Sequence, residues 1–212
     1  MGREFIGLFD EWAKSYDEAV VGHDLEYKDV FINYDKILEE TAEATFGHVI
    51  EFGLGTGNLT EKLITKGRSV YGVEPSAEMR TIATKKLNDV TIVDGDFLNF
   101  PAPKEPVDSI TSTYAFHHLT DEEKDRAIQT YSHMLPTGGV IAFADTIFQD
   151  EEAKQAMISK SEQQGFLNLA QDLRTEYYTT IEFFEQTFEK HDFSVSFKRI
   201  NDFVFLMTAV KR

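Results

Sequence analysis

Short apolar runs alternate along this chain with longer segments of helical periodicity, and this alternation restricts the fold more than any other feature. The apolar runs predict five strands, at residues 48–52, 69–73, 90–93, 107–113 and 140–144. Apolar residues three or four positions apart predict helices at residues 58–66, 76–87, 121–135, 151–164 and 180–190. Strands and helices in this order predict an α/β domain with a doubly wound parallel sheet.

The two ends of the chain depart from this alternation. Residues 9–20 and 30–42 predict two helices ahead of the first strand. Near the C-terminus a run with one polar face is followed, after a short gap, by an apolar run at residues 203–210. A parallel pair needs a long crossover, so these two strands are expected to be antiparallel. We expect one domain over residues 1–212, with N-terminal helices at 1–45 and the sheet at 46–212.

The composition narrows the classes of partner. The formal net charge of −16 argues against a nucleic-acid partner, because such proteins usually carry basic patches. The absence of cysteine excludes disulfides, thiolate metal sites and cysteine nucleophiles. No apolar run approaches the roughly 20 residues that a membrane span needs. We therefore expect a soluble cytoplasmic protein with no membrane partner, and we make no prediction of its oligomeric state.

The segment EFGLGTGNLT, residues 51–60, follows the first strand and contains Gly53, Gly55 and Gly57. Glycines here permit either a tight turn or the close approach of a ligand to the backbone. In doubly wound sheets the ligand lies beyond the carboxyl ends of the strands, where this segment is expected. Glu74 ends the next strand about 20 residues later, the spacing of a ribose-binding carboxylate. The pattern predicts a nucleoside ligand.

The glycine spacing argues against a dinucleotide. The dinucleotide fingerprint G-x-G-x-x-G requires a third glycine where this chain has Asn58. No Gly-Lys-Ser/Thr follows, so the segment is not a P-loop either.

Five segments in this order resemble the motifs of class I S-adenosylmethionine-dependent methyltransferases. They are VIEFGLGTGNL, VYGVEPS, VDGDFLNF, VDSITSTYAFHHLTD and MLPTGGVIAFAD, and the match runs from about residue 48 to residue 145. The likeness is greatest to small uncharacterised bacterial methyltransferases with ubiquinone-biosynthesis-like motifs. Leu54 and Thr137 depart from the commoner residues of the motifs. The resemblance implies a Rossmann-like sheet of order 3-2-1-4-5-7-6 with strand 7 antiparallel, and S-adenosyl-L-methionine as cofactor.

The same resemblance assigns roles to particular residues. Gly53, Gly55 and Gly57 would form the loop around the cofactor, and Glu74 would bind its ribose. Asp96 would meet the adenine amino group and the Phe97 backbone an adenine ring nitrogen.

Two further residues are implied at the methionine end of the cofactor. Glu51 would help hold this end, often through water. The segment FDEWAKSYDEAV resembles a helix that covers the cofactor in small-molecule members, with Tyr16 near the methionine end. Trp12 and Tyr16 lie four residues apart, so they can equally form the core face of a helix.

His117 and His118 follow the fourth strand and are the candidate catalytic residues. Either imidazole can act as a base or orient the acceptor. The alternative is structural, with one ring capping the next helix or packing under a loop. Asp145, at the end of the fifth strand, either faces the same pocket or caps a turn. The spacing of His, Asp and Glu predicts no metal site.

The acceptor class follows by elimination. TYAF at residues 113–116 replaces the Asn/Asp-Pro-Pro-Tyr/Phe motif of base-amine methylation, and carbon-5 pyrimidine methylation needs a cysteine. A small-molecule methyl acceptor remains, and residues 166–178 with the nearby phenylalanines could shape its site. Two other functions stay open: a non-catalytic sensor of S-adenosylmethionine or S-adenosylhomocysteine, and a nicotinamide-dependent oxidoreductase.

Overall fold

The computed structural model describes residues 7, 10, 13, 16, 20 and 24–212 of the chain. The helix predicted at residues 9–20, with its Trp12, lies mostly outside these residues. In the described part of the chain, no helix combines the length and apolar character needed to cross a membrane.

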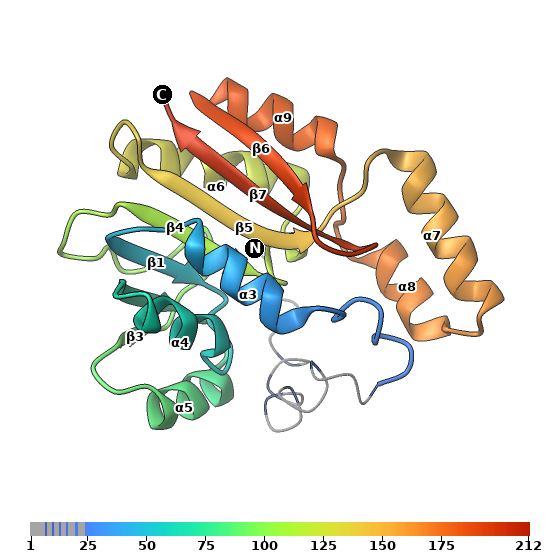
Figure 1. Cartoon of the computed structure of the whole chain (residues 1–212), viewed down its shortest axis with the longest axis horizontal. Helices are drawn as coiled ribbons and strands as arrows, with labels where there is room; N and C mark the ends of the chain where they lie inside the picture. Colours follow the sequence, from blue (N-terminus) through green and yellow to red (C-terminus); the bar gives the residue numbers. More distant parts are fainter. Residues whose placement is uncertain (1–6, 8–9, 11–12, 14–15, 17–19, 21–23) are drawn as a thin grey trace.

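A seven-stranded sheet forms the centre of the molecule, in the order β3-β2-β1-β4-β5-β7-β6 (Figure 1). Strands β1 to β5 are parallel, and β7 pairs antiparallel with both β5 and β6. This confirms the predicted order and the antiparallel pair. The strands are β1 His48–Phe52, β2 Ser69–Val73, β3 Thr91–Val93, β4 Ser109–Thr113, β5 Val140–Thr146, β6 Phe193–Arg199 and β7 Val204–Lys211.

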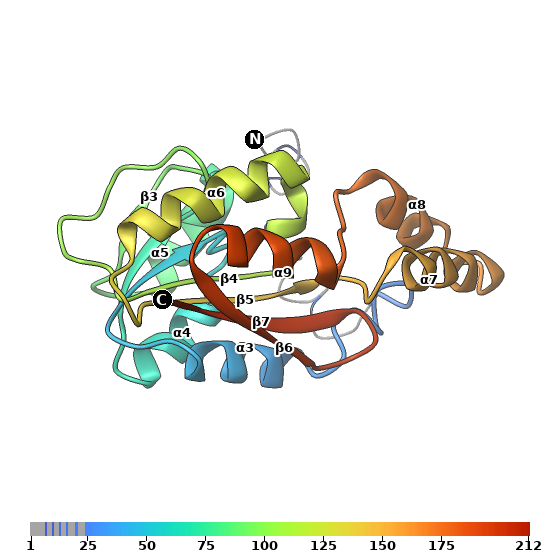
Figure 2. The same ribbon diagram turned by 90° about the horizontal axis from the view of Figure 1, so that it is seen from above.

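Helices cover both faces of this sheet (Figure 2). Helices α3 and α4 lie on one face and α6 and α9 on the other, whereas α7 and α8 pack together beside the carboxyl end of β5. The described helices are α3 Tyr34–Glu43, α4 Asn58–Thr65, α5 Ala77–Lys86, α6 Asp121–Met134, α7 Glu151–Gln163, α8 Leu167–Thr175 and α9 Ile181–Lys190, with a 3-10 turn η3 Phe116–His118.

One predicted helix needs correction, and one helix was missed. The helix expected at residues 30–42 begins only at Tyr34, because Asn33 adopts a left-handed conformation with φ 65° that a helix cannot continue through. Helix α8 was not predicted, because its buried residues Leu169, Ala170 and Leu173 span little more than one turn.

The core on the α6 and α9 face is rich in aromatic rings. Phe52 stacks on Phe97 and on Tyr131, with ring centroids 5.2 Å apart in each pair. Phe184 and Phe188 of α9 are fully buried in the same cluster. Each such ring contributes roughly 1.5–3 kcal/mol through its burial. This rigid layer supports the loops at the carboxyl ends of β1, β3 and β4.

Candidate functional site

A cavity opens at the carboxyl ends of the parallel strands, and its volume is about 680 Å³ when the open mouth is included. Six predicted cofactor residues line it: Tyr16, Gly53, Gly55, Glu74, Asp96 and Phe97. The predicted catalytic residue His118 also lines it, together with Thr113, Tyr114 and Ala115 from the segment after β4. The structure therefore brings residues from four separate motifs to one cavity.

The glycines of the loop after β1 serve different purposes. Gly53 has φ +62°, and a Cβ there would lie 2.7 Å from the Cβ of Ala115. Gly55 has φ +59°, and a Cβ there would meet nothing closer than 3.9 Å, so the backbone is open to the cavity. Gly57 does not line the cavity. It is the N-cap of α4 with φ +88°, where a Cβ would lie 2.6 Å from Leu87 Cδ1.

Glu74 is buried where β2 ends, and both of its carboxylate oxygens are held by the backbone. The N–H of Gly55 donates to Oε2 and the N–H of Ser76 donates to Oε1, each at 2.8 Å. Burial raises the pKa of Glu74 to about 7, although these two donors favour the charged form. The carboxylate is thus fixed beside the glycine loop on the cavity wall.

Asp96 and Phe97 form a turn after β3. Asp96 Oδ1 accepts hydrogen bonds from the N–H groups of Leu98 and Asn99, at 2.9 and 2.8 Å. The Phe97 carbonyl accepts a hydrogen bond from the hydroxyl of Tyr131 at 2.8 Å. Side-chain and main-chain bonds together fix this turn against the aromatic core.

Glu51 lies on β1 behind the glycine loop and does not line the cavity. Its Oε2 accepts a hydrogen bond from the Thr60 hydroxyl at 2.6 Å. Burial raises the pKa of Glu51 to about 8, with Thr60 acting in the opposite direction. Any contact of Glu51 with a ligand must therefore pass through the loop or through water.

Two described positions of the N-terminal segment reach the cavity. Tyr16 lines it, and Asp10 accepts a hydrogen bond from the Ser76 hydroxyl at 2.5 Å, two residues beyond Glu74. These contacts place part of the segment beside the glycine loop.

His117 is held by Asp145 through both its backbone and its ring. The His117 N–H donates to Oδ2 at 3.0 Å, and Nδ1 lies 2.6 Å from Oδ1. The pairing follows from the sheet, because Thr113 of β4 is in register with Ala144 of β5. Burial lowers the pKa of His117, but the Asp145 and Glu176 carboxylates more than offset this and hold it above its usual value.

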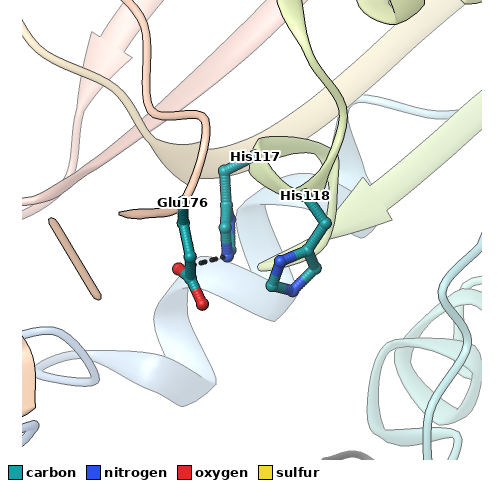
Figure 3. Close-up of side chains that lie close together, drawn as sticks. All are labelled: His117, His118 and Glu176. Atoms are coloured by element: carbon teal, nitrogen blue, oxygen red, sulfur yellow. Dashed lines mark ion pairs between the residues drawn. The ribbon is translucent and has the colours of Figure 1, made fainter. Parts of the chain in front are cut away.

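Glu176 lies beside His117 (Figure 3), and Tyr178 completes the surroundings of the ring. Glu176 Oε2 forms an ion pair with His117 Nε2 at 3.4 Å and accepts a hydrogen bond from the Tyr178 hydroxyl at 2.5 Å. The Tyr178 ring stacks on His117 with centroids 4.7 Å apart, and the His118 ring lies 4.1 Å away. Burial and the neighbouring His117 hold the pKa of His118 well below its usual range, so this ring is neutral.

The sequence did not single out Tyr114, Glu176 or Tyr178. Tyr114 lines the cavity with φ 53°, a conformation that costs a bulky residue energy and is frequent at functional sites. Its sequence position after the fourth strand was a usable signal. Glu176 and Tyr178 follow a helix that was not predicted, and nothing local in the sequence links them to His117.

Comparisons with known proteins place this chain among the methyltransferases. Residues 49–139 match a family model described as a methyltransferase domain. An uncharacterized methyltransferase of Anoxybacillus flavithermus is 57% identical over 212 residues, covering 100% of both chains.

Solved structures show the same fold at low identity. The magnesium protoporphyrin IX methyltransferase of Synechocystis with bound S-adenosylhomocysteine has a TM-score of 0.70 at 15% identity, covering 94% of this chain and 95% of that one. A possible histamine N-methyltransferase of Thermotoga maritima has a TM-score of 0.66 at 17% identity, covering 97% and 99%. The acceptors in these two descriptions differ widely, so the shared fold leaves the acceptor open.

Proposed function

Because this chain belongs to the class I S-adenosylmethionine-dependent methyltransferases, we propose that it transfers the methyl group of S-adenosylmethionine to a small-molecule acceptor. The observation that carries the proposal is the single cavity shared by the predicted cofactor residues, Tyr114 and His118.

The residues present fit this cofactor. Gly55 leaves the backbone open to the cavity, and the Glu74 carboxylate beside it can accept hydrogen bonds from two neighbouring ribose hydroxyls. The turn at Asp96 and Phe97 is the proposed adenine site. Glu51 and Gly57 do not line the cavity, so they would act indirectly. They would support the shape of the glycine loop and the charge distribution around it.

Bound S-adenosylmethionine supplies an activated methyl group on a sulfonium. The protein's remaining task is to hold the acceptor in line with it, and positioning of this kind can contribute roughly 7–11 kcal/mol. We propose that neutral His118, on the cavity wall, orients the acceptor. His117 lies next to the cavity wall and keeps His118 in place.

The experiment combines calorimetric titration with turnover. Wild-type protein is titrated with S-adenosylmethionine, S-adenosylhomocysteine and NADH, and S-adenosylhomocysteine release is then measured over a panel of small acceptors. We expect binding of the first two ligands and none of NADH. Glu74→Ala should weaken cofactor binding at least tenfold, because a ribose hydrogen bond to a charged group contributes about 1.5–3 kcal/mol.

Matched variants separate this result from a general loss of folding. Glu78→Ala, on the exposed side of α5, removes a nearby carboxylate outside the cavity and should bind like wild type. His118→Ala should keep cofactor binding and lose turnover. Equal affinity of Glu74→Ala and Glu78→Ala would overturn the cofactor site, and binding without turnover on any acceptor would favour the sensor.

A further inference from the structure

Three potential metal ligands converge beside the cofactor cavity. His117, His118 and Glu176 each offer one ligand atom, and these atoms all lie within 4.8 Å of one another (Figure 3). Both histidines are buried, and the Glu176 side chain is only 11% exposed. Two imidazoles and a carboxylate form a common ligand set of catalytic zinc, in which a fourth position stays open for water or substrate.

The closest pair already has the spacing that a metal requires. His117 Nε2 and Glu176 Oε2 are 3.4 Å apart, beyond the usual length of an N–H···O hydrogen bond. Ligands about 2.0–2.1 Å from a tetrahedral zinc ion lie about 3.4 Å from each other. The His118 ring, on the cavity side, has to turn toward this pair to complete the set.

Groups behind the ligands hold them in the orientation that coordination needs. Asp145 Oδ1 lies 2.6 Å from His117 Nδ1, and this contact fixes the rotation of the ring so that Nε2 faces Glu176. The Tyr178 hydroxyl donates to Glu176 Oε2 at 2.5 Å. Carboxylates that bind the outer nitrogen of a histidine, and donors to a ligating carboxylate, are typical surroundings of metal ligands.

The Glu176 segment is fixed to the histidines by its own backbone. The N–H of Tyr177 donates to the carbonyl of His117 at 3.1 Å, and buried Lys124 donates to the carbonyl of Tyr177 at 2.5 Å. These bonds explain how Glu176 comes to lie beside histidines that stand 58 and 59 positions earlier in the chain.

The charges around the ligands favour a cation. Asp145, Asp172 and Glu176 bring three carboxylates to this partly buried region. The ammonium of Lys124 is turned to Asp121 and to the Tyr177 carbonyl. A divalent ion would relieve this excess of negative charge.

We propose that His117, His118 and Glu176 bind one divalent transition-metal ion of the zinc type, with its open position toward the cavity that His118 lines. Nitrogen donors favour zinc and its neighbours over magnesium or calcium, which prefer oxygen. The proposal goes beyond the proposed function, because metal binding can be measured without cofactor or acceptor. An acceptor hydroxyl at the open position would release its proton more readily.

The test uses the full-length, tag-free protein after treatment with a chelator and dialysis. Zinc chloride is titrated calorimetrically into wild type and into Glu176→Gln, which keeps the shape of the side chain but removes its charge. The matched control is Glu162→Gln, an exposed glutamate of α7 that pairs with Arg174. We expect one zinc ion per chain, unchanged affinity in Glu162→Gln and at least tenfold weaker binding in Glu176→Gln.

Cobalt(II) gives a second, spectroscopic readout on the wild type alone. Binding at the proposed site should produce the intense visible d–d bands of a four- or five-coordinate ion, and zinc should displace them. Magnesium chloride at the same concentration should leave these bands unchanged.

Equal zinc affinity in the two variants, or weak octahedral cobalt spectra only, would overturn the proposal. His117 would then be a protonated ring held between Asp145 and Glu176. Cofactor titration of the same samples shows separately whether the proposed function stands.

Discussion

Asp145 accepts two hydrogen bonds from His117: its Oδ2 receives the backbone N–H at 3.0 Å and its Oδ1 lies 2.6 Å from Nδ1. The same Oδ1 also receives the N–H of Thr146 at 2.7 Å. One buried carboxylate at the end of β5 therefore fixes the position of the turn after β4, the rotation of its first histidine and the start of the next loop.

Replacing this carboxylate should destabilise the protein in proportion to the donors left unpaired. Asp145→Ala leaves three buried donors without a partner and should lower the free energy of unfolding by about 3–5 kcal/mol. Asp145→Asn keeps one acceptor oxygen and should cost about 1–3 kcal/mol. Urea unfolding measures both. The exposed helix cap Asp150 is the control, because asparagine caps a helix as well as aspartate. Equal effects of Asp145→Asn and Asp150→Asn would contradict the argument.

The buried carboxyl group of Glu51 should make the stability of the wild type depend on pH in a way that the Glu51→Gln variant does not. Its pKa is about 8 in the folded protein and near 4.5 in the unfolded chain, so the folded state holds a proton that the unfolded state loses. Its stabilising effect is present below pH 4.5 and is lost as the pH rises through 8. Glu51→Gln keeps the hydrogen bond from Thr60 without the titration.

The variant and the wild type should therefore have similar unfolding free energies at pH 4.5. At pH 9 the variant should be more stable by up to roughly 4 kcal/mol. Urea unfolding without ligand at both pH values measures this difference, and other titrating groups cancel in the comparison. If the difference in unfolding free energy between the variant and the wild type does not change with pH, Glu51 is ionised in the folded protein throughout this range.

Much of this architecture was predictable because its signals are local. Buried parallel strands are apolar nearly throughout, so β1 and β2 were predicted with the bounds that the structure gives. The glycine loop and Glu74 each follow such a strand, and parallel strands bring their carboxyl ends together. The glycine loop and Glu74 could thus be assigned to one edge of the sheet, whereas the roles of Asp96 and Phe97 followed only from the resemblance to methyltransferase motifs.

The approach of Glu176 to His117 was not predictable in this way. It depends on the hydrogen bond from Tyr177 to His117 and on buried Lys124, which are tertiary contacts without a sequence period. The expectation of no metal site rested on spacing within the chain, and spacing cannot show a ligand that comes from a distant segment.

Gly53 and Gly138 provide a matched test of the glycine loop. Both have positive φ, but a Cβ on Gly138 would meet open space, whereas one on Gly53 would lie 2.7 Å from the Cβ of Ala115. Gly138→Ala should cost about 1–2 kcal/mol, the penalty of the left-handed conformation alone. Gly53→Ala adds a steric clash and should cost about 2–4 kcal/mol.

The two variants should also differ in ligand binding. Relief of the clash displaces Ala115 and the cavity wall after β4, so Gly53→Ala should weaken S-adenosylmethionine binding, while Gly138→Ala should leave it unchanged. Thermal unfolding and calorimetry measure the two effects. Similar behaviour of both variants would mean that the close approach of Gly53 to Ala115 has no consequence for the site.

Lys124 connects the stability of the fold to the geometry around Glu176. Its side chain is 1% exposed, and its ammonium donates to Asp121 at 3.0 Å and to the Tyr177 carbonyl at 2.5 Å. Lys124→Met keeps the apolar stem and removes both bonds, leaving the Tyr177 carbonyl without this donor. We expect a loss of about 2–4 kcal/mol in the free energy of unfolding.

The effect of Lys124→Met on the Tyr177 amide shows whether Lys124 positions the Glu176 segment or only stabilises the whole fold. Hydrogen exchange of the Tyr177 amide, which donates to His117, should speed up in Lys124→Met by more than the global loss of stability explains. Lys36→Met removes an exposed lysine of α3 and should change neither measurement. Uniformly faster exchange across the chain would mean that Lys124 stabilises the whole fold and does not specifically hold Glu176 beside His117.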